Sequence, residues 1–196
     1  MNAPPPPAPS DADLVAQVLA GNPGPFRLLM ERHQQAIFGY VYRLVYPDRE
    51  AAQDLTQGVF LKAYQGLAGV DAARPLRSWL YRIAHNETAN HFRSRARRRE
   101  ATLTEEHWAD LPAPAGSDPE QAHAEAEDAR RVRQAVAALK PRYRQVVTLY
   151  YFEEQSYEEI AAAMAVPPGT VATWLRRAKA QLAGLLGDAG AERAPP

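Results

Sequence analysis

The sequence predicts an all-α protein made of two small helical domains joined by a flexible linker. Three observations predict this fold class. Apolar residues recur every three or four positions through most of the 196-residue chain, as in amphipathic helices. No segment shows the sustained alternation of a half-buried strand. Prolines and a glycine interrupt the helical spacing from about Thr102 to Asp118, and each side of this break is near the lower size limit for an independent domain.

Four helices are expected before the break. Residues 1–9 contain five prolines and nothing to bury, so we expect a disordered leader there. The first helix begins at Ser10, where Asp13 supplies the second half of a capping box, and it ends at Gly21. Apolar spacing and intervening prolines place the next three helices at about residues 25–46, 48–66 and 76–98.

Four shorter helices are expected after the break. Asp118 precedes a proline at the first helical position of one, and Pro141 opens the next, which runs to Phe152. The sequence from Ser156 to Glu159 is a full capping box ahead of the third. After the break AVPPGT, Thr170 is expected to cap a last helix that reaches about Leu186, followed by a disordered tail at 188–196.

The last two helices match a DNA-binding helix-turn-helix, because a short helix, a break with Gly169 and a longer basic helix follow one another. At about 100° per residue, one face of the last helix carries Val171, Trp174, Leu175, Ala178 and Leu182, and the opposite face carries Thr173, Arg176, Arg177 and Ala180. The second face is free to enter a major groove. Gly169 and Thr170 would bring backbone N–H groups to a phosphate. Taken alone, the same pattern fits a helical hairpin with a solvated arginine face.

Charge is unevenly distributed although the formal net charge is zero. Eight arginines and one acid lie between Arg74 and Arg99, whereas residues 100–128 hold nine acids and no Lys or Arg. The arginine-rich helix also carries aromatic residues, and aromatic stacking beside cations suits single-stranded DNA. The face opposite Trp79, Leu80 and Ile83 provides the candidate contacts, which are Tyr81, Arg82, His85, Phe92 and Arg93.

Several other classes of function are disfavoured. The chain has no cysteine, and its five histidines include no i, i+4 pair of the kind that binds a metal on a helix. It also lacks a glycine-rich phosphate loop and a nucleophile elbow. We therefore expect no enzyme activity, no metal and no cofactor. Because no signal peptide or long apolar run is present, the expected location is the cytoplasm.

In its order of features, the chain resembles the sigma-70 family of bacterial transcription initiation factors, and specifically the small two-domain extracytoplasmic-function (ECF) class, from about Asp11 to Leu186. The stretch DREAAQDLTQGVFLKAYQGL resembles the family's second conserved region, whose helix docks on the β′ subunit of RNA polymerase. This resemblance implies five polymerase-contacting residues: Asp54, Leu55, Gln57, Phe60 and Tyr64. Gly58 departs from the family, which usually has an acid there.

Two further stretches carry the resemblance. RSWLYRIAHNETANHFRSRARRR is similar to the helix that reads and melts the minus-10 element, which adds Arg77 and Asn86 to the candidates above. LKPRYRQVVTLYYFEEQSYEEIAAAMAVPPGTVATWLRRAKAQL resembles region 4, whose last helix enters the minus-35 element. The resemblance implies region 2 at residues 10–100, a linker at 101–118 and region 4 at 119–187.

The partners implied by the resemblance are core RNA polymerase, through its β′ and β subunits, promoter DNA and an anti-sigma factor. Two alternatives remain at this stage. One is a helix-turn-helix regulator that never engages core polymerase, which would leave DLTQGVFLKAY unexplained. The other is a helical adaptor, in which the segregated charges serve protein partners only.

Overall fold

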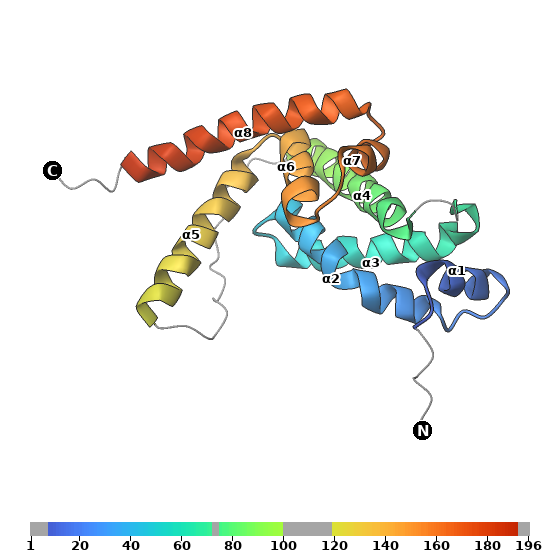
Figure 1. Cartoon of the computed structure of the whole chain (residues 1–196). Helices are drawn as coiled ribbons and strands as arrows, with labels where there is room; N and C mark the ends of the chain where they lie inside the picture. The colour runs from blue at the N-terminus through green and yellow to red at the C-terminus, as the bar shows by residue number, and fades with distance from the viewer. Residues whose placement is uncertain (1–7, 72–74, 100–118, 192–196) are drawn as a thin grey trace, which may run out of the picture.

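The computed structural model describes residues 8–71, 75–99 and 119–191, and within these ranges the chain is helical with no strand (Figure 1). The all-α class is therefore confirmed. Residues 1–7 of the leader predicted at 1–9, the predicted linker at 101–118 and residues 192–196 of the predicted tail lie outside the described residues. The expectation that the tail begins at residue 188 is wrong, because the last helix continues through residues 188–191. The elements are α1 (Asp11–Leu19), α2 (Phe26–Val45), α3 (Arg49–Gly66), η1 (Leu67–Gly69), α4 (Leu76–Arg99), α5 (Pro119–Ala138), α6 (Pro141–Val147), η2 (Thr148–Phe152), α7 (Tyr157–Met164) and α8 (Pro168–Ala191).

In the first domain, α1 to α4 pack around one apolar core, with α2 against both α3 and α4. The apolar spacing predicted from the sequence supplies this core, and its fully buried members include Leu14, Ile37, Leu44 and Val59. The expected capping box at the start of α1 is present: the Asp13 N–H donates to Ser10 Oγ at 3.2 Å, and the Ser10 N–H donates to Asp13 Oδ2 at 2.9 Å.

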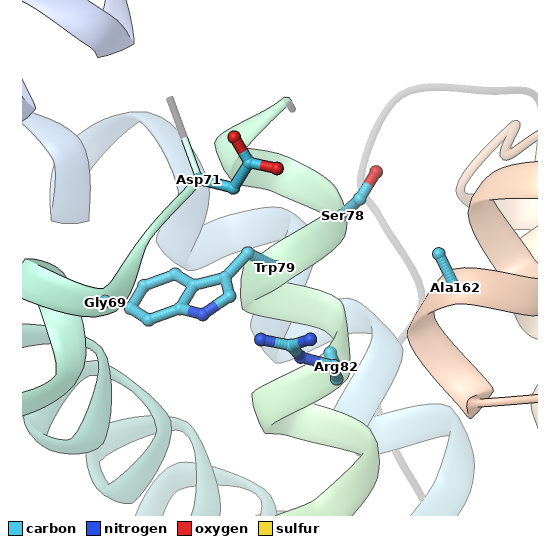
Figure 2. Close-up of a pocket in the computed structure, with 6 residues that line it drawn as sticks. All are labelled: Gly69, Asp71, Ser78, Trp79, Arg82 and Ala162. Atoms are coloured by element: carbon cyan, nitrogen blue, oxygen red, sulfur yellow. The ribbon is translucent and has the colours of Figure 1, made fainter. Parts of the chain in front are cut away.

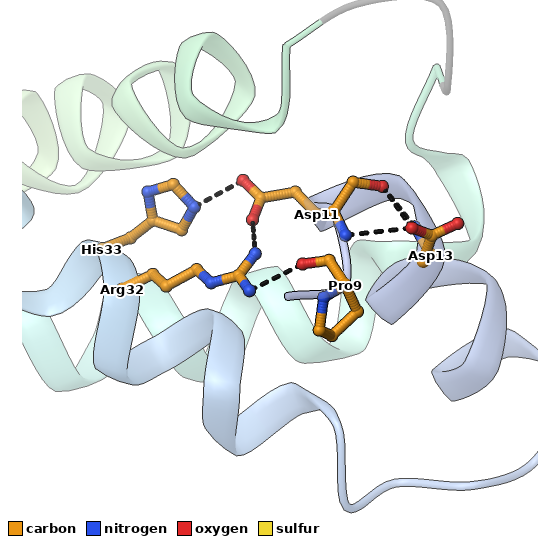
Figure 3. Close-up of polar contacts among 6 residues, drawn as sticks. Pro9, Asp11, Asp13, Arg32 and His33 are labelled. Carbon is orange, nitrogen blue, oxygen red and sulfur yellow. Dashed lines mark hydrogen bonds and ion pairs between the residues drawn. The ribbon is translucent and has the colours of Figure 1, made fainter. Parts of the chain in front are cut away.

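A polar contact fastens α1 to α2 (Figure 3). Arg32 Nη1 donates to Asp11 Oδ1 at 2.8 Å, and its Nη2 donates to the Pro9 carbonyl oxygen at 2.6 Å. His33 Nε2 lies 2.7 Å from Asp11 Oδ2. Partial burial raises the pKa of Asp11, but hydrogen bonds and positive charge from Arg32 and His33 outweigh burial and lower it overall. The first helix is thus held by charge as well as by apolar packing.

The second domain contains α5 to α8. The predicted capping box at Ser156 is formed, since the Glu159 N–H donates to Ser156 Oγ at 3.2 Å. The expectation that Thr170 caps the last helix is wrong. Helix α8 begins at Pro168, three residues before the start that a cap at Thr170 implies, and the Thr170 N–H already donates to the Pro167 carbonyl oxygen at 2.9 Å. Proline suits the first helical position because its φ is fixed near the helical value and it has no N–H to satisfy.

The two domains pack directly on each other. Helix α7 lies along α4, while α5, α6 and η2 contact α2 (Figure 1). The buried apolar residues form one cluster that includes Tyr81 of the first domain and Ile160 of the second. Arg144 of α6 donates hydrogen bonds to the Leu44 carbonyl oxygen at the end of α2 and to the Ala137 carbonyl oxygen of α5. The sequence pattern predicts the two domains but not this contact.

Candidate polymerase and nucleic-acid interfaces

One face of α3 is exposed and mixes polar with apolar side chains. Asp54, Gln57 and Tyr64, all predicted from the sequence, are exposed on it. Leu61 joins them and is 59% exposed, although the sequence analysis did not select it. Its spacing could have shown it, because residues three or four apart share one helix face and Leu61 follows Gln57 by four positions and precedes Tyr64 by three.

The other two residues predicted on α3 support this face from beneath. Phe60 is only 4% exposed and belongs to the apolar core, and Leu55 is half-buried against the same core. The Tyr64 ring meets the Phe26 ring edge-on, with centroids 5.0 Å apart, which fixes the aromatic side chain on the surface. Asp54, Gln57, Leu61 and Tyr64 therefore form the accessible surface, called here the α3 face.

A groove runs between α3 and α4, with a volume of about 650 Å³. One wall contains Lys62 and Gly66, and the other is formed by one side of α4. The α4 side chains that line it are Trp79, Arg82, Ile83, Asn86, Glu87, Asn90 and Arg93. Arg82, Asn86 and Arg93 are exposed. The expectation that Arg82 and Arg93 lie on the face opposite Trp79 and Ile83 is wrong, because all four line this groove. We call this the α4 groove.

Two contacts organise the polar groups of the α4 groove. Arg93 Nη2 donates to Asn90 Oδ1 at 2.5 Å, and Lys62 Nζ donates to Glu87 Oε1 at 2.5 Å. At the end of the groove, Trp79 and Arg82 lie beside Gly69 and Asp71 in a smaller hollow of about 270 Å³ (Figure 2). An indole, two exposed guanidinium groups and two amides thus share one concave surface, which suits stacking and phosphate contacts to an unpaired strand.

Four of the predicted α4 residues, Arg77, Tyr81, His85 and Phe92, do not line the groove. Tyr81 is fully buried, so the expectation that it lies on an open face is wrong for this conformation. Helix α4 packs against its own domain on one side and against the second domain on another, and Tyr81 faces the second domain. Arg77 Nη2 donates to the Glu153 backbone carbonyl oxygen at 2.5 Å.

The remaining two predicted residues of α4 are half-buried. Burial lowers the pKa of His85, which favours the neutral imidazole. The Phe92 ring packs against the core and meets the His91 ring edge-on at 5.8 Å. Neither residue is as accessible as Arg82, Asn86 or Arg93.

Helix α8 has the two faces that the sequence predicts. Val171, Leu175 and Ala178 are buried, whereas Arg176 and Arg177 are exposed on the other side. Gly169 is exposed in the first turn, where an added Cβ would meet nothing within 4 Å. Thr173 Oγ1 donates to the Gly169 carbonyl oxygen at 2.9 Å, and Thr170 is half-buried. The basic face is therefore open at the start of a helix whose N-terminus favours anions.

The part of the chain with described positions contains no helix that is both long enough and apolar enough to span a membrane. Within those same residues, no group of three or more histidine, aspartate or glutamate side chains is placed to hold a metal ion. The surfaces that stand out are thus the α3 face, the α4 groove and the basic face of α8.

Comparisons with known proteins match both domains. The family model for sigma-70 region 2 matches residues 29–98, and the model for sigma-70 region 4 matches residues 129–182. The RNA polymerase sigma-H factor of Pseudomonas aeruginosa is 35% identical over 174 residues, which cover 86% of this chain and 90% of that protein. The ECF RNA polymerase sigma-E factor of Escherichia coli K12 is 32% identical over 175 residues, covering 87% and 91%.

Two solved structures have a similar fold. The sigma factor RpoE of Bartonella quintana, in complex with the anti-sigma factor NepR, has a TM-score of 0.69 and 25% identity, and covers 83% of this chain and 96% of its own. CnrH in complex with the cytosolic domain of CnrY has a TM-score of 0.66 and 27% identity, with coverage of 91% and 97%.

An arginine-rich helix beside a helix-turn-helix domain is typical of DNA-binding proteins. The chain belongs to the sigma-70 family of RNA polymerase sigma factors, within the ECF class. It directs RNA polymerase to promoters and starts transcription there. The alternatives of a regulator without polymerase and of a helical adaptor are set aside, because both domains match this family.

Proposed function

We propose that this sigma factor docks on core polymerase through the α3 face, receives the minus-10 strand in the α4 groove and reads the minus-35 element with the basic face of α8. The observation that carries the proposal is the α4 groove itself. Arg82, Asn86 and Arg93 stand exposed along one side of it, with Trp79 at its end. Arginines neutralise phosphates, amides bond to base edges, and an indole stacks on an unpaired base.

The α3 face has the composition of a protein-binding site. Exposed Leu61 and Tyr64 provide an apolar centre, and Asp54 and Gln57 provide a polar border. Phe60 and Leu55 would act indirectly, by holding the helix in place from within the core. A helix surface of this kind fits a partner helix of the polymerase β′ subunit, and the β subunit would meet the second domain.

On α8, Arg176 and Arg177 would contact bases or phosphates, with Gly169, Thr170 and Thr173 near the DNA backbone. Two DNA-binding domains on one chain make the second binding event intramolecular, so two weak sites at the correct spacing give tight joint binding. Promoter specificity would then depend on the spacing between the two elements as well as on their sequence.

The DNA contacts are tested by replacing Arg82 and Asn86 with alanine and measuring holoenzyme binding to a minus-10 fork-junction DNA. Each replacement should weaken binding about tenfold, since a good base or phosphate contact contributes about 1–3 kcal/mol. The matched control is Arg27→Ala, whose side chain is 80% exposed on α2 and pairs only with Glu31, at 3.4 Å. Equal binding by all these variants would contradict the assignment of the α4 groove.

Polymerase docking is tested separately with Leu61→Ala and Tyr64→Ala, using the affinity for core polymerase as the measurement. Truncation of a central apolar contact typically costs at least about 2 kcal/mol, which is about a thirtyfold loss of affinity. The matched control is Leu19→Ala on α1, which is 52% exposed and outside the α3 face. If the Leu61 and Tyr64 variants bind core polymerase like the control, docking occurs elsewhere.

We also propose that an anti-sigma factor controls this chain, that the chain acts in the cytoplasm and that it has no catalytic activity of its own. Support for the first point is that the solved relatives named above were captured with NepR and with the cytosolic domain of CnrY. An inhibitor that binds the α3 face should compete with core polymerase for this sigma factor. Competition in a binding assay that Leu61→Ala weakens for both partners would support the proposal, and independent binding would contradict it.

A further inference from the structure

The contact between the two domains is centred on one buried carboxylate. Glu153 follows η2 in the second domain, and its side chain is only 6% exposed. It enters the first domain between α2 and α4. There, Tyr81 Oη donates to Glu153 Oε2 at 2.5 Å, and Arg43 Nη1 donates to Oε1 at 3.0 Å. Arg77 Nη2 lies 3.9 Å from Oε2 and donates to the Glu153 carbonyl oxygen at 2.5 Å.

Ring contacts surround these polar bonds. The Arg43 guanidinium lies 4.3 Å from the centroid of Phe152, the residue before Glu153, so Arg43 meets the second domain twice. On the other side, the Tyr81 ring packs edge-on against the fully buried Tyr40 at 5.3 Å. We call the interaction of Glu153 with Arg43, Arg77 and Tyr81 the Glu153 contact.

The backbone conformation around Glu153 directs its side chain toward the first domain. Residues 148–152 form a wide turn in which the Glu153 N–H donates to the Thr148 carbonyl oxygen five residues back, at 3.1 Å. The next residue, Glu154, has a positive φ of 52°, a conformation that non-glycine residues rarely adopt. A buried carboxylate without partners is costly. Here each oxygen of the Glu153 carboxylate accepts one hydrogen bond, from Tyr81 and from Arg43, and Arg77 binds the backbone carbonyl of the same residue.

The Glu153 contact occupies two residues that the promoter would need. Arg77 and Tyr81 were both expected to meet the minus-10 element, yet here one bonds to the Glu153 backbone and the other is fully buried. Helix α7, the first helix of the helix-turn-helix, lies along α4 in the same arrangement. While the domains remain packed in this way, they cannot take independent positions on two separated DNA elements.

We propose that the Glu153 contact is an autoinhibitory lock, which holds the free sigma factor closed until core polymerase and promoter DNA separate the domains. The proposal rests on the promoter-binding function argued above. Opening exposes the buried Tyr81, releases Arg77 from the Glu153 backbone and frees α8 to reach the minus-35 element. Release of the second domain and the availability of Arg77 and Tyr81 on α4 are therefore one event.

The first test locks the closed form covalently. The chain has no cysteine, so Ser78→Cys with Ala162→Cys introduces the only two thiols. These residues come from α4 and α7 and line the same hollow, where Figure 2 shows them facing each other. A short, reducible bismaleimide should cross-link them in the free chain. The cross-linked protein should lose at least about tenfold in promoter-dependent transcription with core polymerase, and reduction should restore it.

The control for cross-linking is Arg27→Cys with Glu31→Cys, an exposed pair one turn apart on α2. Cross-linking this pair should leave transcription unchanged. If the Ser78–Ala162 cross-link forms and transcription remains at the uncross-linked level, the lock is refuted. If the unmodified chain directs no transcription at all, the proposed function has failed instead, and the two failures are thereby distinguished.

The second test opens the lock. Glu153→Ala removes the acceptor of the Tyr81 hydroxyl and the partner of Arg43, so the rate of cross-linking between positions 78 and 162 should fall. Binding of the free chain to fork-junction DNA, measured without polymerase, should rise about tenfold. The matched control is Glu158→Ala, since Glu158 is an exposed acid of α7. If Glu153→Ala cross-links and binds DNA like the control, the lock is refuted.

Discussion

Replacing Tyr81 with phenylalanine removes one hydroxyl from the Glu153 contact and keeps the ring. Burial raises the pKa of Tyr81, so this hydroxyl remains protonated and donates to Glu153 Oε2 at 2.5 Å. Without it, Oε2 keeps only Arg77, at 3.9 Å, which is beyond hydrogen-bond distance. A hydrogen bond to a charged group contributes about 1.5–3 kcal/mol. We expect the free energy of unfolding to fall by about 2 kcal/mol.

Equilibrium unfolding in urea, followed by circular dichroism, gives this free energy. Tyr157→Phe is the control, because Tyr157 is 36% exposed and such a change normally stays within about 0.5 kcal/mol. A double-mutant cycle of Tyr81→Phe with Glu153→Ala isolates the pair, and we expect a coupling energy of about 1–2 kcal/mol. Additive effects, or a Tyr81→Phe loss no larger than the control, would refute the assigned hydrogen bond.

Three further predictions concern stability and pH. Gly58→Ala in α3 should raise the free energy of unfolding by about 0.5–1 kcal/mol, because alanine favours the helical conformation more than glycine does. The added Cβ would lie 3.7 Å from Glu87 Oε2, which is an ordinary contact. An unchanged or lower urea midpoint would contradict this prediction. Burial raises the pKa of Glu153 above its ordinary value of 4.5, against the opposing hydrogen bond of Tyr81 and the charges of Arg43 and Arg77. The closed form therefore binds protons more tightly than the open form. Because maleimides react with the thiolate, cross-linking slows at acidic pH in every variant, so each rate is compared with that of Glu153→Gln at the same pH. The ratio of the two rates between positions 78 and 162 should be highest at acidic pH and should decrease as pH rises through the raised pKa; a constant or rising ratio would contradict the assignment. The pKa of Asp11 is lowered below 3.8, so its stabilising contribution is present above that value and is lost as pH falls through the lowered pKa. Asp11→Asn should remove that part of the acid dependence in urea unfolding at several pH values, at a cost of at most about 1 kcal/mol for this partly exposed pair.

Local signals in the sequence predict most of the fold. The capping boxes at Ser10 and Ser156 form as expected, because a cap depends on residues only three positions apart. The start of α8 was misplaced by three residues because two prolines and a threonine compete as start signals there. The two faces of α8 were predicted correctly, since one side of that helix packs and the other is free.

The site is harder to predict wherever distant segments meet. Apolar spacing indicates one buried face per helix, but α4 has two, and the burial of Tyr81 depends on a residue 72 positions further along the chain. Glu153 stands in the polar sequence FEEQS and has no local feature that distinguishes it from its exposed neighbour Glu154. Its role comes from Arg43, 110 positions away, and such a pairing is visible only in three dimensions.

The wide turn at residues 148–152 has a consequence for how such proteins diverge. It contains one more residue than an ordinary helical turn requires, and loss of a single codon there would rotate every later side chain by about 100°. The acid that now enters the first domain would then point elsewhere, while the helix-turn-helix itself would be unchanged in sequence. A related protein would therefore lose this intramolecular inhibition through one three-nucleotide deletion in its gene, without any substitution in a DNA-reading residue.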